Sequence, residues 1–150
     1  MRNIKKLSLA ALSLLTITFI QSACAIDNPD APDYVKLFEK SERPFLKAIQ
    51  KPTNGTRDTI RAYHEYKLFL DKELNSVYKL LKSKLSKERQ AELTISQRHW
   101  IKFRDAEFEL INNNWSRKTF GSSFAISRGD YSSTIIRNRV IQLLNYAKNY

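Results

Sequence analysis

Residues 56–84 and 86–114 are two long stretches that contain neither glycine nor proline, and they constrain the fold more than any other feature of the sequence. In the first stretch, apolar residues recur three or four positions apart from Ile60 to Leu81, which in an α-helix places them on one face. Ser86 is a favourable cap for a second helix. Because the connection around Ser86 is so short, the two predicted helices must lie antiparallel.

The segments on either side complete an all-α prediction. Residues 26–55 are expected to form an N-terminal arm, in which Asp33 caps a short helix, Pro44 interrupts it, and the Lys-Pro-Thr-Asn-Gly cluster at 51–55 ends it. Residues 134–149 have three-and-four apolar spacing and the length of a further helix. The sequence thus predicts a small antiparallel bundle of about three to four helices, with a helical domain over 56–150.

Residues 116–133 break the helical pattern, because glycines and serines alternate with isolated aromatic residues. We expect one long irregular loop here. Long loops in compact domains are often binding elements, although a solvent-exposed loop fixed by its aromatic residues fits the same pattern. The candidate partner-binding residues are Phe120, Ser122, Phe124, Arg128, Asp130 and Tyr131.

The first 25 residues have the pattern of a secretory signal peptide. Basic residues precede an apolar run over 7–20, and Ala23-Cys24-Ala25 supplies a small-residue cleavage site. The run is too short for a transmembrane helix. Lipidation of Cys24 is the alternative, but Gln21 stands where a lipoprotein signal has an apolar residue. We therefore expect a periplasmic or secreted protein that starts at Ile26 and has no cysteine for a disulfide.

Enzyme chemistry is the class that the sequence supports least. The two histidines, His64 and His99, fall on different predicted helices without metal-ligand spacing. No nucleophile motif or nucleotide-binding glycine motif is present, so we expect neither a cofactor nor a metal. Glu73 facing Glu107 or Glu109 could still form a carboxylate pair in three dimensions.

The formal net charge of +11 includes Arg2, Lys5 and Lys6 of the predicted signal peptide, which contains no acidic residue. The basic excess that remains without them favours an anionic partner. For an exported chain whose lysines are spread rather than clustered, nucleic acid is not the expected partner.

The segment Gln97–Asp105, with the sequence QRHWIKFRD, places polar side chains in register with an apolar stripe. Positions 97, 100, 104, 107 and 111 share one helix face, so Arg104 can stack on Trp100 one turn earlier. Asn75 and Tyr78 on the preceding helix are the polar groups expected opposite. They could form a polar network with Gln97 and Arg104 that fixes the helix register, or the face could be an open recognition groove.

The sequence resembles the LprI-like family of small exported bacterial proteins, which is named for a lysozyme inhibitor. The matching segments are 70–78 (LDKELNSVY), Gln97, 100–107 (WIKFRDAE), 121–123 (GSS), and Thr134 followed by Arg137. The family pattern carries cysteines that are absent here, with Phe108, Ala62 and the region of Tyr131 in their places. The structural signature that the resemblance implies is Asn75, Tyr78, Gln97, Trp100, Arg104 and Asp105.

The resemblance implies a helical envelope protein that inhibits lysozyme by binding it. Animal lysozymes are themselves basic, so net charge would repel the two proteins. Either a local acidic patch does the binding, or the target is something else. The alternative is an envelope scaffold or stress protein that binds an anionic cell-surface polymer. If the QRHWIKFRD segment holds helices together, the partner is expected to contact residues 116–133 instead.

Overall fold

A computed structural model describes residues 30–150, so the predicted signal peptide and Cys24 lie outside the described residues. Over the described range every regular element is helical, which confirms the all-α prediction. The long helices are α1 (Tyr34–Ile49), α2 (Thr56–Lys84), α3 (Lys87–Asn114) and α5 (Phe124–Lys148). Between α3 and α5 lie a single-turn helix, α4 (Arg117–Phe120), and a 3-10 turn (Gly121–Ser123).

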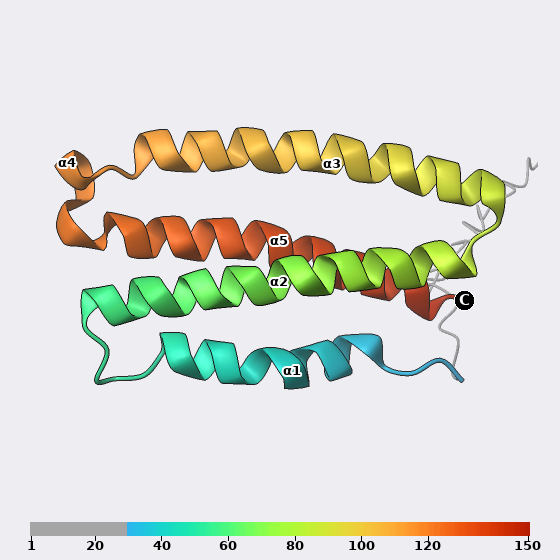
Figure 1. Ribbon diagram of the computed structural model, residues 1–150, viewed down its shortest axis with the longest axis horizontal. Helices are drawn as coiled ribbons and strands as arrows, with labels where there is room; N and C mark the ends of the chain where they lie inside the picture. Colours follow the sequence, from blue (N-terminus) through green and yellow to red (C-terminus); the bar gives the residue numbers. More distant parts are fainter. Residues whose placement is uncertain (1–29) are drawn as a thin grey trace, which may run out of the picture.

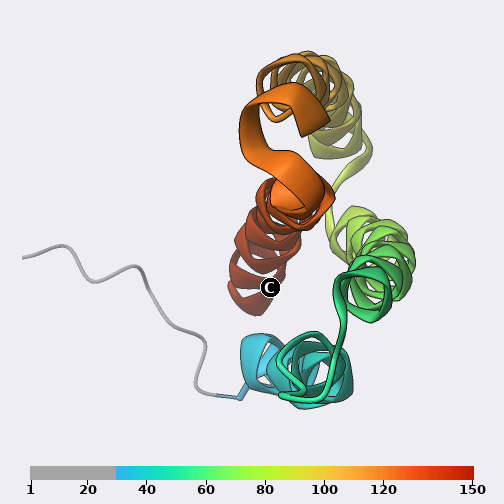
Figure 2. The same ribbon diagram turned by 90° about the vertical axis from the view of Figure 1, so that its left-hand side faces the viewer.

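The long helices form a bundle in which each one runs antiparallel to the next along the chain (Figure 1). As a result α2 and α5 run parallel, and these two make the most extensive contact in the bundle. Figure 2 shows α1 and α3 on opposite sides of this central pair. The predicted antiparallel course of α2 and α3 is confirmed, but α3 packs mainly against α5.

The core follows the central pair of helices. Leu70, Val140 and Leu143 have no exposed surface. Phe38 brings α1 into the same core. Leu93 is the residue of α3 among its buried members, and Trp100 and Phe108 of α3 pack against it while partly exposed. The remaining buried members come from α2 and α5: Tyr66, Leu74, Val77, Leu81, Ile136, Leu144 and Ala147.

Helix α1 is continuous through Pro44, so the predicted interruption at this residue is wrong. A proline in a helix interior removes one hydrogen bond to the carbonyl four residues earlier, here that of Lys40. Both Pro44 and Lys40 are exposed, so water can satisfy that carbonyl. The inner face of α1, with Phe38, Glu42 and Phe45, packs against the bundle and keeps the helix in one piece.

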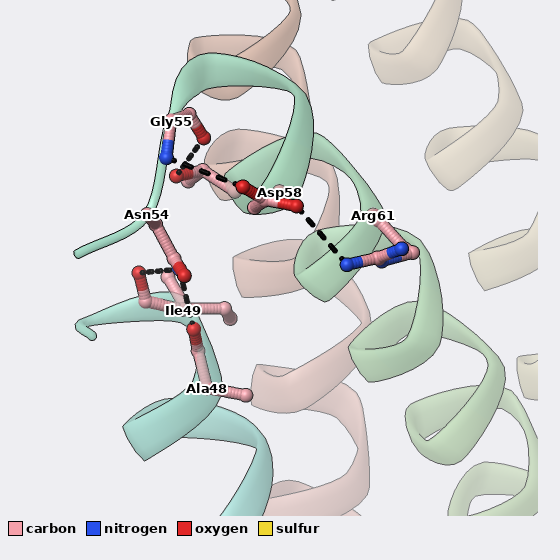
Figure 3. A network of polar contacts seen from close by, with 7 residues as sticks. Ala48, Ile49, Asn54, Gly55, Asp58 and Arg61 are labelled. Atoms are coloured by element: carbon pink, nitrogen blue, oxygen red, sulfur yellow. Dashed lines mark hydrogen bonds and ion pairs between the residues drawn. The ribbon is translucent and has the colours of Figure 1, made fainter.

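The turn between α1 and α2 is held by side chains that satisfy both helix ends (Figure 3). Asn54 Nδ2 donates to the carbonyl oxygens of Ala48 (2.7 Å) and Ile49 (3.4 Å) at the end of α1. The Asp58 carboxylate accepts from the Gly55 amide (3.4 Å) at the start of α2. Asp58 therefore caps α2 from inside its first turn.

The predicted long irregular loop over 116–133 is wrong, because residues 117–123 form α4 and the 3-10 turn and α5 begins at Phe124. Three of the serines that suggested a loop, Ser127, Ser132 and Ser133, lie inside the helix. Ser132 and Ser133 are buried, and their hydroxyls donate to the carbonyls of Arg128 and Gly129 one turn earlier. Small side chains here reflect close helix packing, because Gly129 lies against the Tyr63 ring of α2.

Replacing Gly129 with alanine is expected to destabilise the protein by about 1–2 kcal/mol. A Cβ at this position would lie 2.7 Å from Tyr63 Cγ and 2.8 Å from its Cβ, so the inflexible stem of the ring blocks it. Such overpacking costs about 1–3 kcal/mol, against a gain of about 0.5–1 kcal/mol in helix propensity. Urea denaturation would measure the difference. Thr134→Ala, at an exposed position of the same helix, is the control and should not destabilise.

A buried ion pair joins α1 to α5 beside α2. Glu42 is 1% exposed and accepts two hydrogen bonds from Arg137, from Nε (2.7 Å) and Nη2 (3.0 Å). The hydroxyl of Tyr66 donates to the same carboxylate. Burial, followed by this hydrogen bond to Glu42, raises the pKa of Tyr66, and the Glu42 carboxylate raises the pKa of Arg137. One carboxylate therefore fixes three helices together.

No helix among residues 30–150 is both long enough and apolar enough to cross a bilayer.

Candidate functional site

Of the two alternatives for the α3 face that carries Gln97, Trp100 and Arg104, the structure shows the one in which this face turns towards the bundle. Gln97, Trp100, Arg104 and Glu107 are half-buried, and Ile111 is buried. The guanidinium of Arg104 lies 5.5 Å from the Trp100 ring centroid, which confirms the predicted stacking. Trp100 is packed against the hydrophobic core, so this face of α3 is occupied by packing.

Arg139 of α5 is the centre of the polar network on this face. It is 6% exposed and donates to Gln97 Oε1 (3.0 Å), Ser96 Oγ (3.2 Å) and Gln142 Oε1 (2.7 Å). Its guanidinium also lies 5.8 Å from the Trp100 ring centroid. Burial lowers the pKa of Arg139, because all three acceptors are neutral. Two arginines, Arg137 and Arg139, within the largely apolar stretch 135–144 were the sequence signal for buried basic residues.

The other signature residues lie apart from this network. Asn75 is exposed and donates to the Asp71 carbonyl of its own helix (2.8 Å), so it does not face α3. The hydroxyl of Tyr78 lies 3.1 Å from that of Thr94 and links α2 to α3. Asp105 is exposed and accepts from Arg104 (2.7 Å). The network predicted among Asn75, Tyr78, Gln97 and Arg104 is therefore replaced by one centred on Arg139.

An exposed aromatic cluster lies at the end of the bundle where α3 turns into α5. We call it the aromatic tip and define it as Trp115, Phe120 and Tyr131, together with the neighbouring Arg117 and Lys118. The Trp115 ring lies 4.7 Å from that of Tyr131 and 6.2 Å from that of Phe120. Phe120 and Tyr131 remain 44% and 43% exposed. Figure 1 places α4, which carries Phe120, at the extreme end of the molecule.

Local structure holds the aromatic tip in place. Arg128 donates to the carbonyls of Asn112 and Trp115 at the end of α3, and its guanidinium lies 4.8 Å from the Phe124 ring centroid. Gly121 has φ +59° and ψ −141°, a conformation that side chains disfavour, and this allows the sharp turn after Phe120. The tip is thus fixed to α3 and α5.

The six predicted partner-binding residues are divided by this arrangement. Phe120 and Tyr131 meet at the aromatic tip, and Ser122 is exposed beside them on the 3-10 turn. Phe124 and Arg128 are half-buried and belong to the support beneath.

Asp130, the sixth predicted residue, is exposed and accepts from the Tyr63 hydroxyl (3.2 Å). Burial, followed by the nearby Asp130 charge, raises the pKa of Tyr63 to about 12. Tyr63 therefore keeps its donor proton at neutral pH.

The stretch of sequence that leads into the aromatic tip carries basic residues and no acidic ones. Residues 110–129 contain no Asp or Glu, and Arg117 and Lys118 are exposed. Sequence reasoning missed these two residues and Trp115, because Trp115 was not separated from the asparagine run that ends α3. An aromatic residue directly after a helix end, followed by two basic residues, was the available signal.

A shallow pocket lies behind the tip, between α2, α3 and α5. Its volume is ≈ 200 Å³ and its lining includes Tyr63, His64, Lys67, Phe108 and Arg128. Small-molecule sites usually occupy about 300–1,000 Å³, so this pocket is too small to suggest a substrate site.

Metal-ligating side chains do not gather in the described part of the chain, where no group of three or more could hold an ion. His64 and His99, the two histidines considered from the sequence, are both exposed.

Residues 33–143 of the chain match the protein-family model described as lysozyme inhibitor LprI. The chain belongs to the LprI family. The match includes α1, which lies before the region where the sequence resemblance was recognised, and covers the signature face of α3 and the aromatic tip. No curated protein and no solved structure gave a significant match to the chain.

Proposed function

We propose that this LprI-family protein is an exported, non-enzymatic binding protein that inhibits a lysozyme-type muramidase, and that the aromatic tip is its contact surface. Membership of the LprI family carries the functional part of this proposal. Export rests on the signal-peptide pattern of residues 1–25. The choice of surface rests on the exposure of Phe120 and Tyr131 and on the charge around them.

Local charge favours the aromatic tip despite the net charge of the chain. Muramidases of this class hydrolyse the glycosidic bond with a pair of carboxyl groups in a substrate cleft. A basic projection complements such a cleft, even where the remaining surfaces of the two proteins repel each other. Arg117 and Lys118 would approach those carboxylates, whereas Asp130, which precedes Tyr131 in the sequence, accepts a hydrogen bond from the Tyr63 hydroxyl.

The aromatic residues would supply most of the binding energy. Interface residues whose truncation costs about 2 kcal/mol or more are enriched in Trp, Tyr and Arg, and they work best when the surrounding structure holds them in place. Trp115, Phe120 and Tyr131 are held by the end of α3, by α4 and by α5. The tip therefore loses little conformational freedom on binding.

A cell-wall clearing assay with purified protein and muramidase tests the proposal. We expect the wild-type protein to slow clearing, and Phe120→Ala and the double variant Arg117→Glu/Lys118→Glu each to weaken inhibition at least tenfold, about 1.4 kcal/mol. The matched control is Lys79→Glu/Lys87→Glu. It makes the same change in net charge near the α2–α3 turn, at the opposite end of the bundle (Figure 1).

The control should inhibit as the wild type does. If both charge-reversed proteins lose inhibition equally, the total charge matters and the tip does not. If the wild-type protein at excess leaves clearing unchanged, the inhibitor function is wrong. Mass measurement of the exported chain separately tests cleavage before Ile26.

A further inference from the structure

Helix α3 has a second apolar face, about a third of a turn from the face that packs on the bundle. Large apolar side chains on it are about half exposed: Ile95 55%, Phe103 53% and Leu110 52%. With His99 and Ala106, which are also exposed, they recur three or four positions apart and form one stripe. We call these five residues the α3 stripe. They lie on a different face from Leu93, Trp100 and Ile111, which turn towards the bundle.

A helix that is apolar on two sides normally packs on two sides. Helix α3 packs mainly on α5 and occupies an outer position in the bundle (Figure 2). The three large side chains of its stripe are each more than half exposed, so the described residues leave much of the stripe uncovered. Single exposed apolar residues are ordinary on protein surfaces, but an ordered stripe over four turns of one helix indicates an interaction surface. With 28 residues, α3 is long enough, about 42 Å, for an extended pairing.

Charges beside the stripe are arranged in two halves of opposite sign. Arg98 and Lys102 lie before its midpoint, and Asp105 and Glu109 lie after it, all exposed and on the same flank. Asp105 is bonded to Arg104, whereas Arg98, Lys102 and Glu109 have no hydrogen-bond or ion-pair partner within residues 30–150. Such a pattern is self-complementary when a second copy is reversed in direction.

We propose that two copies of the protein associate through their α3 stripes as an antiparallel, two-fold symmetric pair. In this arrangement Phe103 of each copy lies near the symmetry axis, and Ile95 of one copy faces Leu110 of the other. On the charged flank Arg98 faces Glu109 and Lys102 faces Asp105, twice by symmetry. A two-fold interface uses the same patch on both copies, which is the property that this flank has.

The acidic half of the flank distinguishes this partner from a membrane. An anionic bilayer would attract Arg98 and Lys102 but repel Asp105 and Glu109, whereas a reversed copy satisfies both halves. The antiparallel pairing also leaves each aromatic tip free, with the two tips at opposite ends of the pair. The inference is independent of muramidase binding.

Sedimentation velocity over a wide range of protein concentration tests the pairing. We expect the wild-type protein to shift from the monomer mass to twice that mass as concentration rises. Phe103→Glu should abolish the shift, because two carboxylates would meet at the axis. Leu37→Glu is the matched control. Leu37 is 56% exposed on α1, on the other side of the bundle, and its replacement should leave the dimer intact.

Charge reversal tests the orientation. Arg98→Glu and Glu109→Lys should each weaken self-association about tenfold, since each places like charges opposite one another twice. An equimolar mixture of the two variants restores both ion pairs, so a heterodimer should form with wild-type affinity. Circular dichroism of each variant checks that the exposed substitutions leave the fold intact.

The proposal is overturned if the wild-type protein stays monomeric at every concentration, or if Phe103→Glu dimerises as the wild type does. A dimer that Phe103→Glu abolishes, but that charge reversal weakens without rescue in the mixture, would contradict the antiparallel register. Since muramidase inhibition is measured separately, failure of either proposal leaves the other standing.

Discussion

The Arg137→Met variant is expected to have a free energy of unfolding about 3 kcal/mol lower than the wild-type protein. Removing one member of a buried ion pair costs about 3–5 kcal/mol, because the remaining charge keeps its desolvation penalty. Glu42 is 1% exposed and would retain only the Tyr66 hydroxyl as a partner. The Arg137 side chain is 30% exposed, which places the effect at the lower end of the range. Urea denaturation followed by circular dichroism measures it.

Arg89→Met is the matched control, because Arg89 also makes two short bonds to one carboxylate, that of Glu92 (2.7 and 2.8 Å). Both side chains of that pair are more than half exposed, so its loss should have a far smaller effect. A second variant, Glu42→Met/Arg137→Met, removes both charges and should recover much of the lost stability. Equal effects of the two single Arg→Met substitutions would show that the Glu42 pair is not a structural link.

Truncation of Leu143 to alanine is expected to destabilise the protein by about 2–5 kcal/mol, the usual cost of deleting a fully buried leucine side chain. Leu143 has no exposed surface and lies in the core shared by α2 and α5, the most extensively packed helix pair. Because every long helix except α3 depends chiefly on this core, the loss should lower the stability of the whole bundle in one transition. Thermal denaturation and urea denaturation both measure it.

Phe103→Ala provides the comparison for Leu143→Ala. It removes a larger apolar side chain, but one that is 53% exposed on the outer face of α3. At a protein concentration low enough to avoid association, its effect should stay within about 0.5 kcal/mol. A large destabilisation by Phe103→Ala under those conditions would mean that the α3 stripe supports the fold of the single chain.

Helical periodicity in the sequence predicted the parts of the fold in which local signals agree with packing. The bounds of α2 and the Ser86 cap of α3 follow from unbroken apolar spacing and from cap chemistry. The stacking of Arg104 on Trp100 followed from positions one turn apart. These features depend on neighbours within a single helix, so the sequence specifies them directly.

Features that depend on distant partners were not predictable in the same way. In the sequence, Gly129 resembles a loop residue. Only the fold shows that Tyr63, 66 positions earlier, leaves no room for a side chain at this position. Charged residues such as Glu42 and Arg139 are rarely buried in proteins. Only their hydrogen-bond partners on other helices explain why these two are. The aromatic tip combines the end of α3, the single turn of α4 and the start of α5, so Trp115 gained significance only from the fold.

The parallel course of α2 and α5 has a consequence for how the chain folds. The principal core joins residues far apart in sequence: Tyr63 bonds to Asp130, 67 positions away, and Glu42 bonds to Arg137, 95 positions away. Such contacts require a long loop to close before they contribute, which slows folding relative to bundles whose neighbours in sequence pack together. Helices α2 and α3 therefore gain most of their packing only when α5, which follows them in the chain, is in place.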